Sequence, residues 1–186
     1  ERITNHLLLG TSYEENLDDG TKKSFSFKYI DFENIENNHF FVTEELIVDR
    51  ANQNEITKTR RPDLVVFVNG IPLVVIELKK SSVNYENGIK QLEKEQKKDE
   101  IPHLFKYIQL TIAANSNEAR YGTMGTPLKF YSVWKEDKST IDDREKRLSK
   151  LIKTRAISQL DRTLFSLFSK DRLLDIVQNF TLFDKK

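Results

Sequence analysis

The chain has 186 residues, a length that suits one domain with a sizeable core and leaves little room for two. Its 30 lysines and arginines balance 29 acids, so a net charge of +1 excludes a global field that would hold a polyanion, and any nucleic-acid site must be a local patch. The absence of cysteine excludes disulfides and thiolate metal sites and fits a reducing cytoplasm. No stretch approaches the ~20 apolar residues that span a bilayer, so we expect no membrane partner.

A turn and two strands are predicted in the first fifty residues. Asp19-Gly20 is a turn signal, and the alternating Phe25, Phe27 and Tyr29 after it are typical of a half-buried strand. Residues 39–49, HFFVTEELIVD, predict a second strand.

The most informative stretch is RRPDLVVFVNGIPLVVIELKK, residues 60–80. It contains two apolar runs, 64–68 and 71–76, on either side of Asn69-Gly70, and an Asn-Gly pair between such runs is the strongest short signal for a β-hairpin. Because both runs are apolar on both faces, the hairpin is predicted to lie at the centre of a sheet.

The remainder of the chain alternates between helix and strand patterns. Residues 83–98 predict a helix, because apolar residues recur there at i, i+4 and i+7. Strands are predicted at 105–114 and 128–134, joined by a loop, and after a second loop at 135–143 the periodic leucines predict helices, the last of them with Ser169 as N-cap. This order predicts a mixed sheet with helices packed on it.

Charged residues stand at both ends of the hairpin. Asp63 begins it, and it ends in Glu77 and a pair of lysines, although charges beside a buried sheet are destabilising unless they are paired, hydrated or bound to a metal. Glu77 and Lys79 point to the same side, because side chains in a strand repeat every two residues. A two-residue turn places Asp63 opposite Ile76, whereas a longer turn, a one-residue bulge or a bend before the strand places it beside Glu77. We expect the second arrangement, with the two carboxylates on strands about 4.8 Å apart.

Two carboxylates near a lysine indicate a magnesium site. Magnesium prefers carboxylate, water and substrate phosphate to a cage of protein ligands, and it can polarise a phosphoryl oxygen. The lysine would hold or deprotonate an attacking water, or stabilise the charge of the transition state. The chemistry that these groups favour is hydrolysis of a nucleic-acid backbone.

Pro62-Asp63, thirteen residues and then Glu77-Leu78-Lys79 resemble the PD-(D/E)xK nuclease motif. The whole stretch 60–80 closely resembles the nuclease segment of the restriction (R) subunit of type I restriction-modification enzymes. The resemblance extends to GIKQLEKEQ at 88–96, to FKYIQLTIAANS at 105–116 and to the final LLDIVQNFTLFD, which is similar to the lead-in to the helicase motor of that family.

The resemblance implies an α/β domain of the PD-(D/E)xK fold, with a central mixed sheet flanked by helices. It implies a prokaryotic, cytoplasmic endonuclease that needs Mg²⁺ and cleaves double-stranded DNA. Asp63 and Glu77 would be the metal ligands, Lys79 the catalytic lysine and Gln91 a supporting residue on the following helix. The methyltransferase and specificity subunits would be its partners, and ATP would serve only a motor domain that lies outside this chain.

Two features depart from the family pattern. The family often has a tyrosine four residues after the glutamine, where this chain has Glu95, which puts the role of that position in doubt. Many such nucleases also take a further acid from an N-terminal helix, and we assign none. Because the first residue is not methionine, we expect residues 1–186 to be a single nuclease domain cut from a longer protein, without that helix and without the motor.

Other charged groups have weaker signals. Arg60 and Arg61 form the most basic local stretch and could contact phosphates, although a solvated approach to the strand is an equal alternative. Lys80 could also contact phosphate, but a solubilising charge at the strand end is favoured. The glycines of YGTMGT, 121–126, lack the lysine and hydroxyl of a phosphate-binding loop, so we expect no ATP site.

Two other functions remain open from the sequence. One is a non-catalytic module that keeps the nuclease fold in order to bind DNA or to dock the motor, which the exchange of tyrosine for Glu95 favours. The other is a stand-alone repair or recombination nuclease, which the absence of motor motifs downstream would favour.

Overall fold

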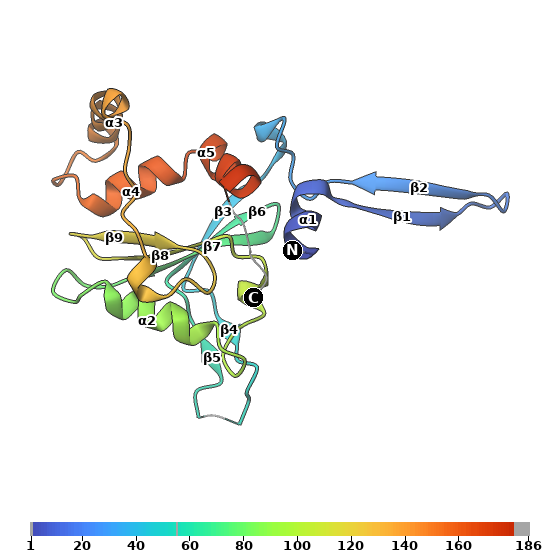
Figure 1. Ribbon diagram of the computed structural model, residues 1–186, viewed down its shortest axis with the longest axis horizontal. Coiled ribbons are helices and arrows are strands. Elements are labelled where there is room, and N and C mark those ends of the chain that lie inside the picture. Colours follow the sequence, from blue (N-terminus) through green and yellow to red (C-terminus); the bar gives the residue numbers. More distant parts are fainter. Residues whose placement is uncertain (1, 55, 181–186) are drawn as a thin grey trace.

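The computed structural model describes residues 2–54 and 56–180 (Figure 1). Its helices are α1 (Arg2–Leu9), α2 (Glu86–Glu95), α3 (Lys138–Leu151), α4 (Gln159–Leu167) and α5 (Lys170–Asp175). Its strands are β1 (Thr11–Asn16), β2 (Lys22–Phe27), β3 (Phe40–Glu44), β4 (Val48–Asp49), β5 (Thr59–Arg60), β6 (Leu64–Val68), β7 (Ile71–Leu78), β8 (Leu110–Ala114) and β9 (Ala119–Gly122). Short 3-10 helices lie at Ile35–Asn37, Leu104–Lys106 and Leu128–Phe130, and Ile176–Phe180 is π-helical.

A five-stranded sheet forms the centre of the described part of the chain, in the order β3-β6-β7-β8-β9. β7 and β8 are parallel, and the other neighbouring pairs are antiparallel. Helix α2 covers one face of this sheet, whereas α4 and α5 cover the other (Figure 1). The predicted mixed sheet flanked by helices, with the 64–76 hairpin at its centre, is confirmed.

Alternation along β7 divides its side chains between the two cores. Val75 packs on the α2 side with Ile89, whereas Val74 and Ile76 pack on the opposite side with residues of α4 and α5. Because Glu77 is two residues after Val75, it points to the α2 side. The strand pattern therefore directs its carboxylate toward the helix that follows the hairpin.

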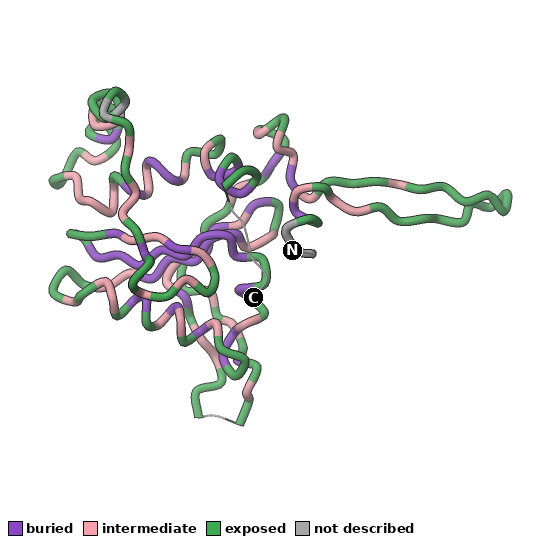
Figure 2. The backbone as a smooth tube through the Cα atoms, in the orientation of Figure 1, coloured by how far each residue is buried: buried purple, intermediate pink, exposed green. Residues whose placement is uncertain are grey.

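Strands β1 and β2 form a separate antiparallel ribbon around the predicted turn, where Gly20 has a φ of +80°. The ribbon extends away from the sheet and is mostly exposed (Figure 2). Helix α1, which we did not expect, packs at its base, where Leu7 is buried in the core. None of the residues Arg2–Leu9 is acidic, so α1 supplies no further acid to the site.

The strand predicted over 39–49 is broken. Glu45 has a φ of +49°, which ends β3, and the chain continues as the short strand β4, paired with β5. At this break the backbone N–H of Glu45 donates to the carbonyl of Asp63 at 2.9 Å. This hydrogen bond therefore fixes the backbone at Asp63, immediately before β6.

Several boundaries in the second half also differ from the prediction. The run 105–114 becomes a strand only at Leu110, the predicted loop contains β9, and the strand predicted over 128–134 is instead a 3-10 turn with one bridge, Tyr121 to Ser132. Helix α3 begins at Lys138, inside the predicted loop 135–143. Ser169 occupies the N-cap position of α5 but makes no capping hydrogen bond with its side chain.

None of the helices in the described ranges combines the length and apolar character needed to cross a membrane.

Candidate active site at the end of the hairpin

The hairpin has the register that brings two acids together. Asn69 and Gly70 have φ values of +51° and +81°, as a tight two-residue turn with a right-handed twist requires, and Val68 pairs with Ile71. A register shift after Val66 then adds one residue to β7, so that Leu64 pairs with Ile76. This register confirms the expected placement of Asp63 opposite Glu77, and of the three routes that the sequence left open the structure has the one-residue bulge.

Asp63 lies next to Glu77 as a result of this bulge, one position beyond Leu64 and Ile76, the last pair of the β6–β7 ladder. The backbone N–H of Leu78 donates to Asp63 Oδ2 at 2.6 Å, which fixes the carboxylate against the end of β7. Asp63 is half-buried, and its charge contributes to the environment of Glu77.

Glu77 is fully buried, and its two oxygens have different surroundings. Oε2 lies 3.3 Å from Lys79 Nζ, whereas Oε1 has no hydrogen-bond partner among the described residues. Burial, together with the charges of Glu95 and Asp63, raises the pKa of Glu77 to about 8, although Lys79 opposes the shift. A buried carboxylate oxygen without a partner is destabilising, and a cation at this position would relieve that penalty.

Lys79 is connected to helix α2 through Gln91. Its Nζ donates to Gln91 Oε1 at 2.7 Å, and Gln91 Nε2 donates to Glu95 Oε1 at 3.0 Å. Four of the residues that the sequence predicted for the site are therefore brought to one place by the start of β6, the end of β7 and one face of α2: Asp63, Glu77, Lys79 and Gln91.

Gly88 allows α2 to approach the sheet closely at the site. A Cβ atom at this position would lie 3.1 Å from Ala113 Cβ, which is closer than ordinary contact, and 3.4 Å from Glu77 Cβ, at the lower limit of ordinary contact. From the sequence we assigned no role to Gly88 and left the role of Glu95 in doubt, although their spacing from Gln91, three and four residues, places all of them on one face of a helix.

The three basic residues proposed for DNA contact have different environments. The guanidinium of Arg60 is bound to the buried carboxylate of Glu100, with Nε 2.7 Å from Oε2, and its side chain is only 17% exposed. Arg61 is 60% exposed and lies 3.5 Å from Glu45, and Lys80 is exposed. Arg61 and Lys80 are thus accessible from solvent, whereas Arg60 holds β5 against Glu100 in the segment that follows α2.

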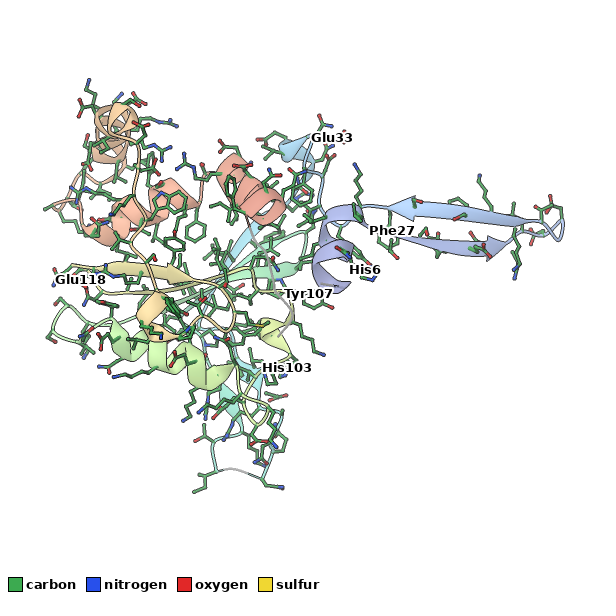
Figure 3. All side chains as sticks on the ribbon, viewed as in Figure 1. His6, Phe27, Glu33, His103, Tyr107 and Glu118 are labelled. Carbon is green, nitrogen blue, oxygen red and sulfur yellow. The ribbon has the colours of Figure 1, made fainter. Side chains whose placement is uncertain are left out.

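A polar cleft of about 410 Å³ opens directly after the lysine pair. It is lined by residues 81–85, by Asn115, Asn117 and Glu118, and by Arg120, whose guanidinium lies 4.7 Å from the Tyr85 ring centroid. Glu118 marks this end of the sheet in Figure 3, whereas the labelled His6 and Tyr107 lie at the opposite end, near α1.

The donor set fits Mg²⁺. Magnesium is usually held by one or two carboxylates and otherwise by water and substrate phosphate, and Asp63 and Glu77 supply two carboxylates, one with an unpartnered buried oxygen. No cluster of three or more acidic or histidine side chains that could hold a metal exists within the residues that the structure describes. These two carboxylates would therefore supply only part of the coordination of the ion, and water and substrate would supply the rest.

Comparisons with known proteins agree on one family. Residues 1–130 match the family model described as Type I restriction enzyme R protein N terminus (HSDR_N). The HindI type I restriction enzyme endonuclease subunit of Haemophilus influenzae is 30% identical over 174 residues, which cover 92% of this chain and 15% of the relative. The EcoprrI type I restriction enzyme endonuclease subunit of Escherichia coli is 32% identical over 133 residues, covering 69% of this chain and 38% of the relative.

A Methanocaldococcus jannaschii relative is 31% identical over 191 residues, which cover 100% of this chain but 18% of the relative. The chain thus spans less than a fifth of the length of this relative and of the Haemophilus protein.

Proposed function

This chain belongs to the family of type I restriction enzyme R protein N termini, and we propose that it is the magnesium-dependent endonuclease domain of such a subunit, which hydrolyses phosphodiester bonds of double-stranded DNA. The observation that carries the proposal is the buried Glu77 carboxylate, whose free oxygen lies at the mouth of the hairpin with Asp63 and Lys79 beside it. We further propose that the sheet and its flanking helices form a PD-(D/E)xK fold over the single domain 1–186.

Asp63 and Glu77 would hold the metal ion in this proposal. The N–H of Leu78 fixes Asp63 Oδ2, and burial fixes Glu77, so neither carboxylate needs to reorganise when the ion binds. Bound Mg²⁺ would supply electrophilic stabilisation of the charge that develops on the phosphodiester.

Lys79 orients the reacting water or the phosphate. An ammonium has three N–H groups, of which one points to Gln91 and one to Glu77. The third can donate to a water or to a phosphate oxygen at the metal, and Gln91 keeps the lysine from swinging into solvent. The lysine thus places a positive charge where negative charge develops in the transition state.

We assign phosphate contacts outside the site to the basic side chains that are exposed to solvent. Arg61 and Lys80 flank the two acids and are exposed, so they can neutralise neighbouring phosphates. Arg60 acts indirectly, because Glu100 binds its guanidinium.

The larger assembly is also part of the proposal. The relatives are named as endonuclease subunits of type I restriction enzymes, and most of their length lies outside the match. We propose that the full protein carries an ATP-driven motor, works with methyltransferase and specificity subunits that choose the target, and acts in the prokaryotic cytoplasm.

The test uses the full-length protein with its partner subunits, DNA and ATP, as wild type and as Asp63→Ala. The proposal predicts that the variant translocates along DNA like the wild type but does not cleave it. Equal cleavage by both proteins would show that the site is assigned wrongly. Translocation by both without cleavage by either would favour a non-catalytic nuclease-fold module, and a reading frame without motor motifs after residue 186 would favour a stand-alone nuclease.

A further inference from the structure

We propose that Glu95 is a positioning residue of the nuclease site, which fixes the side-chain amide of Gln91 so that its carbonyl oxygen holds the ammonium of Lys79. This inference rests on the proposed function of the site. It assigns a role to the position where the chain departs from the family's tyrosine.

The contacts form a continuous chain from the helix to the reacting centre. Glu95 Oε1 accepts from Gln91 Nε2 at 3.0 Å, and Gln91 Oε1 accepts from Lys79 Nζ at 2.7 Å. Lys79 in turn lies 3.3 Å from Glu77 Oε2.

Glu95 determines which end of the Gln91 side-chain amide faces Lys79. A glutamine amide has an acceptor oxygen at one end and two N–H donors at the other, and the two orientations have nearly the same shape. If the amide were reversed, its N–H groups would face the ammonium of Lys79, and two donors would meet. An acceptor at position 95 binds the N–H end and so keeps the carbonyl toward Lys79.

The burial of Glu95 is unusual for a residue on a strongly charged helix. It is 1% exposed, and its second oxygen, Oε2, has no hydrogen-bond partner among the described residues. The backbone carbonyl of Glu95 accepts from the N–H of Ile101 at 3.0 Å, which fixes the end of α2. A partly satisfied buried carboxyl lowers stability, so its place here indicates a role in the site.

A direct metal role does not fit the arrangement. The described residues contain no group of three acidic or histidine side chains placed around one ion, so Glu95 does not join Asp63 and Glu77 as a third ligand. Its contact with the reacting lysine passes through Gln91, and Glu95→Gln, which keeps an acceptor but has no charge, separates this contact from the effect of the Glu95 charge on Glu77.

The test compares two substitutions in the full-length enzyme with its partner subunits, DNA and ATP. Glu95→Gln retains an acceptor oxygen for Gln91, whereas Glu95→Leu has a similar volume and no acceptor. Loss of a supporting hydrogen bond of this kind lowers activity by about 10–100-fold. We expect Glu95→Leu to lower the turnover number for cleavage by that factor without raising the DNA concentration needed for half-maximal rate, and Glu95→Gln to cleave close to the wild-type rate.

A double-mutant cycle shows whether Glu95 acts through Gln91. In the Gln91→Ala background, Glu95→Leu should cause no further loss, because the amide that it positions is gone. The proposal would be overturned if the fold-loss of turnover in the double variant were the product of the fold-losses in the two single variants. It would also be overturned if Glu95→Gln folded but cleaved as slowly as Glu95→Leu.

Metal binding supplies a readout that does not depend on cleavage. Mn²⁺ binding to the full-length subunit without ATP, measured by calorimetry, should be retained in Glu95→Leu and reduced in Asp63→Ala. Loss of Mn²⁺ binding in Glu95→Leu would make Glu95 a ligand and contradict the inference. If Asp63→Ala cleaves normally, the proposed function itself is wrong, whereas wild-type cleavage by Glu95→Leu refutes the positioning role alone.

Discussion

Replacing Glu77 with glutamine should stabilise the metal-free protein while abolishing cleavage. The carboxylate is fully buried, one of its oxygens has no partner among the described residues, and its pKa is raised from 4.5 to about 8. Glutamine is nearly isosteric and carries no charge. The substitution therefore removes the penalty of burying an anion but keeps the packing of β7 against α2.

The magnitude follows from the pKa shift. Each unit by which the pKa of Glu77 is raised corresponds to about 1.36 kcal/mol of unfolding free energy. This destabilisation exists only at pH values where Glu77 is ionised in the unfolded chain. The penalty is therefore nearly absent below pH 4.5, below about 1 kcal/mol at pH 5, about 3 kcal/mol at pH 7 and complete above pH 8. Because folding takes up a proton between these pKa values, wild-type stability falls as the pH rises through this window.

The assay is urea unfolding of the 186-residue chain with a chelator present, for wild type and Glu77→Gln at pH 5 and pH 7. The variant should be more stable at pH 7, by up to about 3 kcal/mol, and the difference should shrink at pH 5. Added Mg²⁺ should stabilise the wild type but not the variant. A variant that is less stable than the wild type in chelator, or a difference in stability that does not change with pH, would show that burial of the Glu77 carboxylate does not destabilise the metal-free protein.

Three further substitutions test the framework around the site by urea unfolding. Gly88→Ala should lower stability by about 1 kcal/mol and impair cleavage, because overpacking against β7 and β8 outweighs the gain in helix propensity; unchanged stability and cleavage would contradict the close approach of α2. Asn69→Ala should lower stability by about 2–3 kcal/mol, because it removes three side-chain hydrogen bonds and a residue that tolerates positive φ; a loss below about 0.5 kcal/mol would show that these bonds do not hold the turn. Arg60→Ala should lower stability by about 1–3 kcal/mol, because it removes a partner of the buried Glu100, whereas the matched control Arg61→Ala should change it by less than about 0.5 kcal/mol; equal effects would contradict the different roles of the two arginines.

The hairpin was predictable because its signals are local. The apolar runs on both faces, the Asn69-Gly70 turn and the charged ends all lie within one short stretch of sequence. The register followed from the chemistry, because it places Asp63 and Glu77 side by side, whereas the bulge that produces it was one of three open possibilities. The position of Gln91 came from the family resemblance, and the contact with Lys79 gives it a physical reason.

The misplaced elements depend on distant contacts. The strand over 39–49 has a continuous β pattern, yet Glu45 adopts a positive φ where its N–H reaches Asp63 across the chain. Residues 128–134 have the composition of a strand, but β9 takes the edge position beside β8, and only one bridge connects Ser132 to it. No local pattern shows which of two such segments will pair with the sheet.

Two residues of the site could not be recognised from their own surroundings in the sequence. In the sequence, Gly88 is only a residue of low helix propensity within a predicted helix. Its role depends on the packing of Glu77 and Ala113 against it, which the structure shows. Glu95 resembles one more exposed charge on a helix with many, and its burial follows from the way α2 lies on the sheet.

The most direct test of the account is a crystal of this protein soaked with Mn²⁺ and measured at a wavelength where manganese scatters anomalously. We predict an anomalous peak between the carboxylates of Asp63 and Glu77, at coordination distance from Glu77 Oε1 and with Lys79 nearby. Fully occupied manganese elsewhere on the protein, with no peak between these two carboxylates, would contradict it.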